Sequence, residues 1–282
     1  MNQEIEPFIA QPVWQTLRVF GPDAATWLNG IVTCDVLSVQ EGQGVWGSLL
    51  TKQGKITADL QIVGHSKELF VGLSGGDAAE TLEILDGYLV MEDAEIEHSS
   101  RSWVVSSNQE LPDEWSKSEV AHGVLPWGNC SVHAWALNEK LGTEVLSEKL
   151  RPPLLTPLQW SAWCTRQGIP LFGVDYKSSD NLHAASLERR TVDWSKGCYL
   201  GQEVVCMQDM RGKVRRRLML LAFEEGANVT PLAEVVNNKQ EVVGEVRSVA
   251  GEIALVSLRS PEFAPGTKLR VGSTPGVVQA LV

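Results

Sequence analysis

The chain has 282 residues, of which 43% are hydrophobic and 21% charged, and its net charge at pH 7 is −11. That length suits two or three lobes with a substantial core. No apolar run approaches the roughly 20 residues of a membrane span. The negative charge argues against broad contact with nucleic acid or anionic membranes, because both would be repelled. The acidic start carries no targeting pattern, so the cytoplasm is the expected location.

The five cysteines are odd in number, widely spread and contain no Cys-x-x-Cys pair. This pattern argues against a disulfide framework and against a structural zinc site. It also lacks the closely spaced thiols that usually hold an iron–sulfur cluster. None of the five histidines is spaced like a metal cluster, so we expect no metal ion bound by this chain alone.

Helix and strand signals alternate in the first half of the chain. Residues 21–30 begin with Gly-Pro and end in Gly, which predicts a short helix. Apolar residues on both sides of a Gln-Gly pair in 46–63 predict two strands joined by a turn. Residues 77–89 predict a helix with an Asp cap and leucines at helical spacing. Residues 99–125 are polar and contain proline around 108–112, which predicts a long excursion between elements.

The second half begins with a helix and ends in β structure. Thr156 followed by proline predicts the helix start, and Gly168 its end, with Trp160, Trp163 and Cys164 as its buried stripe. Beyond Arg217, short β-branched runs are broken by turn signals at 237–238, 251–252, 265–266 and 275–276. Such spacing predicts a small antiparallel barrel that begins near Gly212.

Residues 196–203, with the sequence KGCYLGQE, are the most specific stretch of the chain. They set the thiol of Cys198 between two glycines and beside a lysine, an amide and a carboxylate. Only the thiolate is a nucleophile or metal ligand, and an ordinary pKa of about 8.5 leaves a few per cent ionised at pH 7. A lone cysteine is usually a small buried hydrophobe. Here the neighbours favour a functional thiol, with Lys196 lowering its pKa if the two lie close.

A basic stretch follows, in which positive charge is concentrated in an acidic protein by Arg211, Lys213, Arg215, Arg216 and Arg217. One interpretation is the solvated face of an entering strand, in which alternate residues point outward and the others pair with acids. The other is an anion site. Two opposite charges 4 Å apart attract by about 1 kcal/mol in water and about 4 kcal/mol at an effective dielectric constant of 20, so a sheltered cluster would hold a multiply charged anion.

These two stretches resemble the signature of the YgfZ family, folate-binding relatives of the glycine-cleavage aminomethyltransferase, the T-protein. Further matches, in the family's order, lie at 17–24, 28–36, 47–55 and 166–175. The resemblance implies an α+β, aminomethyltransferase-like fold of two lobes plus a C-terminal antiparallel β-barrel around a central hole. It implies a folate-binding core over 1–212 and the barrel over 213–282.

The resemblance also implies a function: a tetrahydrofolate-binding accessory factor that supports assembly or repair of iron–sulfur clusters in client enzymes. Cys198 would be the functional thiol, with transient contacts to client or assembly proteins. Tetrahydrofolate or a derivative would be the cofactor, its glutamate tail received by the basic stretch. The expected folate-binding residues are Gly197, Tyr199, Gly201, Gln202, Glu203, Arg211, Arg215 and Arg216.

The alternative is a folate-dependent aminomethyltransferase or demethylase of one-carbon metabolism, and the sequence leaves enzyme status open. That chemistry needs a general acid or base, for which Asp59 is the candidate; the plain interpretation of Asp59 is an exposed strand residue. The comparable segment of aminomethyltransferases carries two adjacent aspartates, whereas this chain has Ala58 and Asp59. Two further departures place His183 and Met207 where the family commonly has an acidic residue and an arginine. For His183 we expect local packing or hydrogen bonding. Arg166 is expected to stabilise a helix C-terminus.

Overall fold

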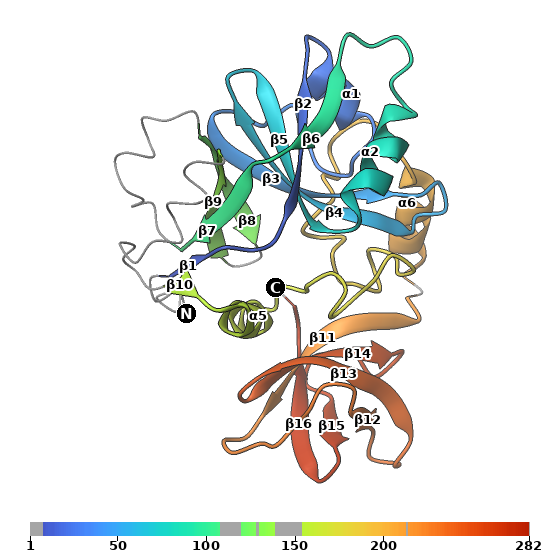
Figure 1. The fold of residues 1–282 in the computed structure, drawn as a ribbon. Helices are drawn as coiled ribbons and strands as arrows, with labels where there is room; N and C mark the ends of the chain where they lie inside the picture. Colours follow the sequence, from blue (N-terminus) through green and yellow to red (C-terminus); the bar gives the residue numbers. More distant parts are fainter. Residues whose placement is uncertain (1–7, 108–119, 128–129, 139–153, 213, 282) are drawn as a thin grey trace. The chain divides into compact units, whose positions relative to one another are not determined.

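The computed structural model describes residues 8–107, 120–127, 130–138, 154–212 and 214–281 (Figure 1). It divides into two compact units, each built from three separate segments. Unit 1 comprises 1–50, 57–157 and 190–200, and unit 2 comprises 51–56, 158–189 and 201–282. In the described residues, no helix has the length and apolar character needed to cross a membrane.

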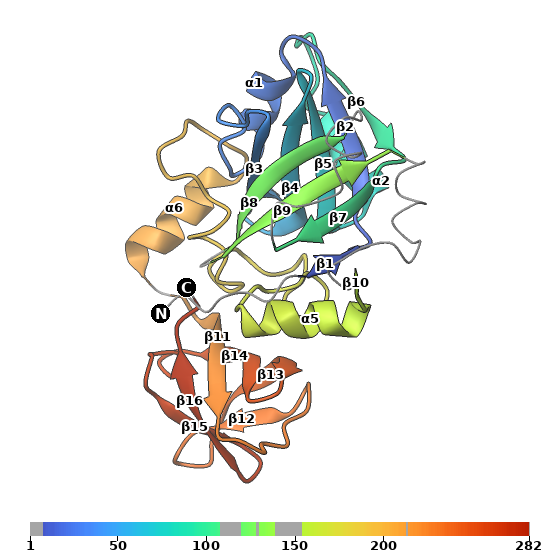
Figure 2. The same cartoon turned by 90° about the vertical axis from the view of Figure 1, so that its left-hand side faces the viewer.

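Unit 1 contains a ten-stranded mixed sheet (Figures 1 and 2). Only β1 with β10 and β3 with β8 pair in parallel among the registers described. The spatial order is β10 (Leu154–Leu155), β1 (Ile9–Ala10), β7 (Ser102–Ser106), β9 (Cys130–Leu137), β8 (Ala121–Trp127), β3 (Gly42–Leu50), β4 (Ile56–His65), β5 (Glu68–Gly75), β2 (Gln15–Phe20) and β6 (Glu95–Ser99).

Two helices complete the main core of unit 1. Helix α1 (Ala24–Asn29) packs against β2 and β5, and α2 (Ala78–Asp86) against β2 and β6. Leu17, Leu28 and Leu85 are fully buried in this core. Each such side chain contributes about 1.5–3 kcal/mol by leaving water, so burial of this apolar face is what makes the short helices stable.

Unit 2 ends in a closed six-stranded barrel of antiparallel pairs. Its order is β11 (Arg216–Phe223), β14 (Ile253–Arg259), β13 (Val242–Ala250), β12 (Glu234–Val236), β15 (Lys268–Val271) and β16 (Thr274–Gln279). Closure removes the unpaired strand edges of an open sheet. Helices α5 (Pro157–Arg166) and α6 (Gln202–Arg211) precede the barrel.

Most predicted elements are confirmed. The Asp77 carboxylate accepts a hydrogen bond from the backbone N–H of Glu80 (2.9 Å), as a cap does, although α2 ends three residues early. Trp160 and Cys164 are buried on α5, whereas Trp163 is only half-buried and stacks on Trp160 at a centroid distance of 5.4 Å. Arg166 is the last residue of α5, the position expected for a cation at a helix C-terminus.

Two expectations were wrong, and one helix was missed. The excursion at 99–125 contains strand β7 and the start of β8, because apolar residues flank its polar middle; residues 108–119 lie outside the described part. Helix α6 was not predicted, since only Val205 of its ten residues is buried. The turn expected at 275–276 lies instead between β15 and β16, and Pro275 stands within β16 as the partner of Arg270.

Candidate functional site

The turn that carries Cys198 is fixed on both sides in unit 1. The Asp193 carboxylate accepts hydrogen bonds from the backbone N–H and hydroxyl of Ser195, at 2.7 and 2.6 Å. The backbone N–H of Leu200 donates to the carbonyl of Ile31 (3.2 Å). The side chain of Cys198 is exposed, and that of Tyr199 is buried. The thiol is thus accessible on a turn held at its base.

Lys196 has a structural role that the sequence did not reveal. Its ammonium donates hydrogen bonds to the carbonyl oxygens of Asn29 (2.6 Å), Val32 (2.8 Å) and Cys34 (2.6 Å). An ammonium has three N–H donors, so these carbonyls use its full capacity. Burial lowers the pKa of Lys196 below its ordinary value. The thiol close to this ammonium is the buried Cys34, whose pKa burial raises to about 12.

The two glycines of residues 196–203 differ in backbone conformation. Gly201 has φ of 79° and stands directly before α6, in the left-handed region that favours glycine. Gly197 has no positive φ, and a Cβ added there would meet open space. Gln202 and Glu203 form the first turn of α6, where the carboxylate interacts favourably with the helix dipole. Residues 196–203 therefore form a loop that leads into helix α6.

Asp59 is buried in unit 1, which contradicts the plain interpretation of an exposed strand residue. It is 2% exposed on β4. The indole N–H of Trp46 donates to its Oδ1 (2.6 Å), and the hydroxyl of Ser74 lies 3.0 Å from Oδ2. The neighbouring Gln61 amide accepts a hydrogen bond from the indole of Trp127 (3.1 Å). Trp46 and Ser74 thus orient the Asp59 carboxylate, and Trp127 orients the amide of Gln61.

Four tryptophans form a continuous cluster around these polar groups. Trp46, Trp127, Trp14 and Trp103 follow one another with ring centroids 5.9, 6.0 and 5.5 Å apart. Tilted aromatic pairs at such distances stabilise by about 0.5–1.5 kcal/mol each. Trp46, Trp103 and Trp127 are buried, and Trp14 is half-buried. The indole N–H groups of this cluster as partners of Asp59 and Gln61 were missed, because strand register decides which side chains meet.

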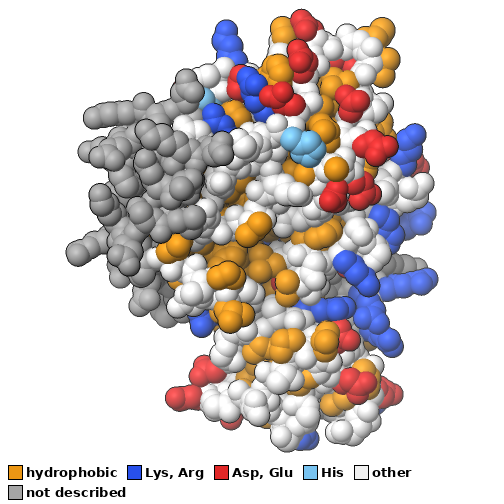
Figure 3. All heavy atoms as spheres, viewed as in Figure 1, with side chains coloured by type: hydrophobic (Ala, Val, Ile, Leu, Met, Phe, Trp, Pro, Cys, Tyr) orange, Lys and Arg blue, Asp and Glu red, His pale blue; other side chains and the backbone are white. Residues whose placement is uncertain are grey.

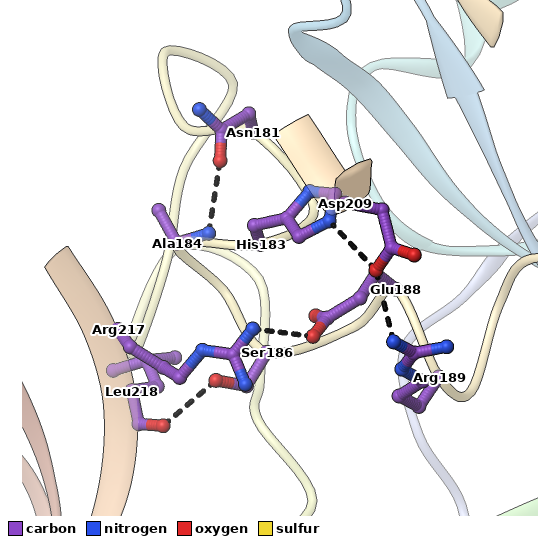
Figure 4. A network of polar contacts seen from close by, with 9 residues as sticks. All are labelled: Asn181, His183, Ala184, Ser186, Glu188, Arg189, Asp209, Arg217 and Leu218. Carbon is purple, nitrogen blue, oxygen red and sulfur yellow. Dashed lines mark hydrogen bonds and ion pairs between the residues drawn. The ribbon is translucent and has the colours of Figure 1, made fainter. Parts of the chain in front are cut away.

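A polar network in unit 2 contains two of the residues singled out from the sequence (Figure 4). His183 is 2% exposed and directs its Nε2 toward the Asp209 carboxylate at 3.6 Å, while Arg189 donates to the same oxygen at 2.9 Å. Arg217 donates to the buried Glu188 at 2.6 Å. His183 is thus a packed residue beside an acid. Arg217 pairs with an acid as the plain interpretation of the basic stretch expects.

A second buried acid in unit 2 was missed. The Asp175 carboxylate accepts hydrogen bonds from the Ser248 hydroxyl (2.6 Å) and from the backbone N–H of Leu171 (2.7 Å). The Thr165 hydroxyl lies 3.0 Å from that of Ser248. Burial raises the pKa of Asp175 to about 6. The sequence alone gives no sign of the pairing, since Ser248 lies 73 residues away. In the described residues, no group of three or more His, Cys, Asp or Glu side chains is arranged to hold a metal ion.

Two domain families and one solved structure match this chain. Residues 11–107 match the GCVT N-terminal domain family, and residues 215–280 match the CAF17 C-terminal beta-barrel domain family. The crystal structure of the glycine cleavage system aminomethyltransferase T from Bartonella henselae superposes with a TM-score of 0.80 at 15% identity, covering 98% of this chain and 85% of that one. The chain therefore has the aminomethyltransferase fold with a C-terminal barrel, which confirms the predicted fold class.

Proteins related in sequence show which members of this class the chain resembles. The chain is 27% identical over 270 residues to tRNA-modifying protein YgfZ of Vibrio vulnificus strain YJ016, covering 91% of this chain and 82% of the relative. It is 25% identical over 284 residues to the protein of the same name in Shigella sonnei, covering 92% and 86%. The chain is thus similar to the YgfZ proteins over most of its length, in agreement with the resemblance seen in the sequence.

Proposed function

We propose that the chain binds tetrahydrofolate or a derivative and supports assembly or repair of iron–sulfur clusters in client enzymes, with Cys198 as the functional thiol. The observation that carries the proposal is the placement of Cys198, exposed on a turn fixed by Asp193 and Leu200. A fixed turn with an accessible sulfur suits brief contact with a cluster or a client protein. Lys196 then acts by holding the backbone beneath the turn.

The ends of helix α6 fit the two ends of a folate. At its start, Gln202 and Glu203 offer an amide and a carboxylate for the polar edge of the pterin. Gly197, Tyr199 and Gly201 shape the turn that leads to them. At its far end, Arg211 and Arg215 are exposed cations for carboxylates. A bound tetrahydrofolate supplies an acceptor for one-carbon units.

The relatives are named tRNA-modifying proteins. A net charge of −11 disfavours binding of RNA by this chain. We therefore place any role in tRNA modification with the client enzymes. Under this proposal the chain contacts proteins and folate, and client enzymes contact the nucleic acid.

Calorimetry with tetrahydrofolate and with its stable 5-formyl form, under reducing conditions, tests the folate part. We expect saturable binding of one molecule per chain. A folded sample that binds neither compound overturns it, and His183 and Met207 then become the first positions to restore to the residues common in the family.

The thiol part is tested by Cys198→Ser, with Cys206→Ser, a half-buried position on α6, as the matched control. The readout is the activity of a cluster-dependent enzyme in cells that depend on this chain. We expect loss with Cys198→Ser and retention with Cys206→Ser. Full support by Cys198→Ser removes the thiol from the mechanism.

A second candidate is a folate-dependent aminomethyltransferase or demethylase, favoured by the orientation of the Asp59 carboxylate by Trp46 and Ser74. Asp59 would serve as acid or base beside the folate amine. Its 2% exposure requires a rearrangement before it touches a substrate. Release of formaldehyde from a methylamine donor, abolished in Asp59→Asn, would favour this candidate over the first.

A further inference from the structure

Strand β6 forms one end of the ten-stranded sheet of unit 1 (Figure 1). In the described part of the chain it pairs with β2 alone, and it forms no other backbone–backbone hydrogen bonds. An edge strand presents a row of unpaired N–H and C=O groups, to which an extended peptide can add as a further strand. The outer edge of β6 is therefore open to such an addition.

The side chains of β6 alternate between the two faces of the sheet. Ile96 packs on the hydrophobic core of unit 1, whereas Glu95 and Glu97 lie on the opposite face. Arg18 donates a hydrogen bond to Glu97 (2.8 Å) and also pairs with Glu68, so this trio keeps one negative charge. Among the described residues, Glu95 forms no ion pair. A strand added to β6 would thus meet acids on one face and an apolar side chain on the other.

The loop before β6 presents two exposed apolar side chains on a fixed backbone. Val90 is 81% exposed and Met91 is 93% exposed. The Glu92 carboxylate accepts hydrogen bonds from the backbone N–H of Val90 (3.1 Å) and of Met91 (3.0 Å). The indole N–H of Trp27 donates to the carbonyl of Tyr88 (3.2 Å). Because hydrogen bonds already order this loop, its apolar groups can bind a partner with little further loss of conformational entropy.

Acids surround these apolar groups and determine the charge of a suitable partner. Residues 86–97 contain five acids and no Lys or Arg. Unit 1 has 9 Lys and Arg against 23 Asp and Glu residues, a net charge of −14. Figure 3 shows acidic side chains gathered with exposed hydrophobic ones over the part of unit 1 where α2 and β6 lie. This field attracts a basic partner and repels nucleic acid, anionic membranes and the identical edge of a second copy.

We propose that the outer edge of β6, together with Val90 and Met91, docks an extended segment of a partner protein in which apolar residues alternate with Lys or Arg. The segment adds one strand to the sheet through backbone hydrogen bonds to β6. Its basic side chains lie beside Glu95 and Glu97. Its apolar side chains pack beside Ile96, and its end reaches the two exposed side chains of the loop. The inference depends neither on folate binding nor on the thiol.

The test titrates the full, isotope-labelled chain with the capped peptide Val-Lys-Val-Lys-Val-Lys and follows the backbone amide signals by NMR. Two further peptides carry N-methyl groups on all valines or on all lysines. The N–H groups of a strand point to its two edges in alternation, so only one of these forms loses the hydrogen bonds to β6. We expect the signals of residues 90–99 to shift with the parent peptide and with one N-methylated form, but not with the other.

Variants of the chain separate the edge from the general field. Glu95→Lys should weaken binding of the parent peptide by about tenfold, because like charges on neighbouring strands repel. The matched control is Glu83→Lys on α2, which changes the net charge of the unit equally at another exposed position. We expect the control to bind the peptide as the wild type does.

Absence of shifts at β6 with the parent peptide overturns the inference. Equal binding of the two N-methylated forms also overturns it, as does equal loss in Glu95→Lys and Glu83→Lys, because the peptide then responds only to the general charge of the chain. If the β6 signals shift with protein concentration when no peptide is present, the edge belongs to a second copy, and the inference fails. Each of these outcomes leaves the proposed function standing, since folate binding and Cys198 are tested separately.

Discussion

Both units bury an acid, Asp59 in unit 1 and Asp175 in unit 2, but they differ in net charge and in the half-buried ion of unit 1. Unit 1 has 9 Lys and Arg against 23 Asp and Glu residues, and unit 2 has 15 against 12. In the acidic unit 1, the ion that ties the turns together is nevertheless a cation, Lys196, held by three backbone carbonyls. Unit 2 is slightly basic, yet it buries the acids Asp175 and Glu188, held by a hydroxyl and a guanidinium. A buried ion is tolerated when its hydrogen bonds are satisfied. Local donors and acceptors, rather than the net charge of the unit, therefore decide which ion is buried.

Among the substitutions predicted below, replacement of Lys196, the cation of unit 1, should lower the free energy of unfolding the most. Lys196→Met leaves three carbonyls without the ammonium, and hydrogen bonds to a charged group contribute more than 1 kcal/mol each. We expect the free energy of unfolding to fall by about 4 kcal/mol, measured by urea denaturation. Lys268→Met, at an exposed position on β15, should change it by less than about 0.5 kcal/mol. Similar small losses in both variants would contradict the role given to Lys196.

Asp175, a buried acid of unit 2, should make the free energy of unfolding depend on pH. Since the pKa of Asp175 is raised from 3.8 to about 6, the folded chain binds this proton more tightly than the unfolded chain does. The contribution of Asp175 to the free energy of unfolding should therefore fall by about 3 kcal/mol as the pH rises from about 4 to about 6.

Asp175→Asn removes that titration, so its stability relative to the wild type should rise by about 3 kcal/mol over the same pH window. Urea midpoints at pH 4, 5, 6 and 7 measure this. Glu225→Gln, at an exposed barrel position, should follow the wild-type curve. Two parallel curves for Asp175→Asn and the wild type would rule out the raised pKa.

The smallest loss of stability is expected from a substitution next to Asp59, the buried acid of unit 1. Ser74→Ala removes a hydroxyl placed 3.0 Å from the Asp59 carboxylate with little change of volume. We expect a loss of about 1.5 kcal/mol, visible as a lower melting temperature in scanning calorimetry. Ser100→Ala, on an exposed turn of the same unit, serves as the control. If both variants melt together, Asp59 does not depend on that hydroxyl.

Local signals in the sequence predicted the elements well. The Asp cap of α2, the Pro at the start of α5 and the turn signals of most barrel strands act within a few residues, so they can be read along the chain. Helix α6 escaped because its single buried residue, Val205, gives no apolar period. Its start is marked by Gly201, whose positive φ appears only in the structure.

The site was less predictable, because its contacts join distant residues. Cys198, the thiol that the sequence singled out, is exposed in the structure, and its functional role stays a prediction. The partners of Lys196 and Asp175 lie far from them in sequence, and no spacing rule connects such positions. For the basic stretch, the sequence supplied the charge cluster, while only the structure shows that Arg217 pairs with Glu188 and that Arg211 and Arg215 line a pocket.

The contacts of Lys196 also set an order of events during synthesis on the ribosome. Its three carbonyl partners are made 162 to 167 residues earlier. At typical translation rates this is a delay of roughly 8 to 30 s. Throughout that interval the turn at 29–34 exists without the ammonium that satisfies it. The growing chain therefore supplies the last hydrogen-bond donor of this turn only when the segment bearing Cys198 emerges, so the thiol and this part of its support are completed together.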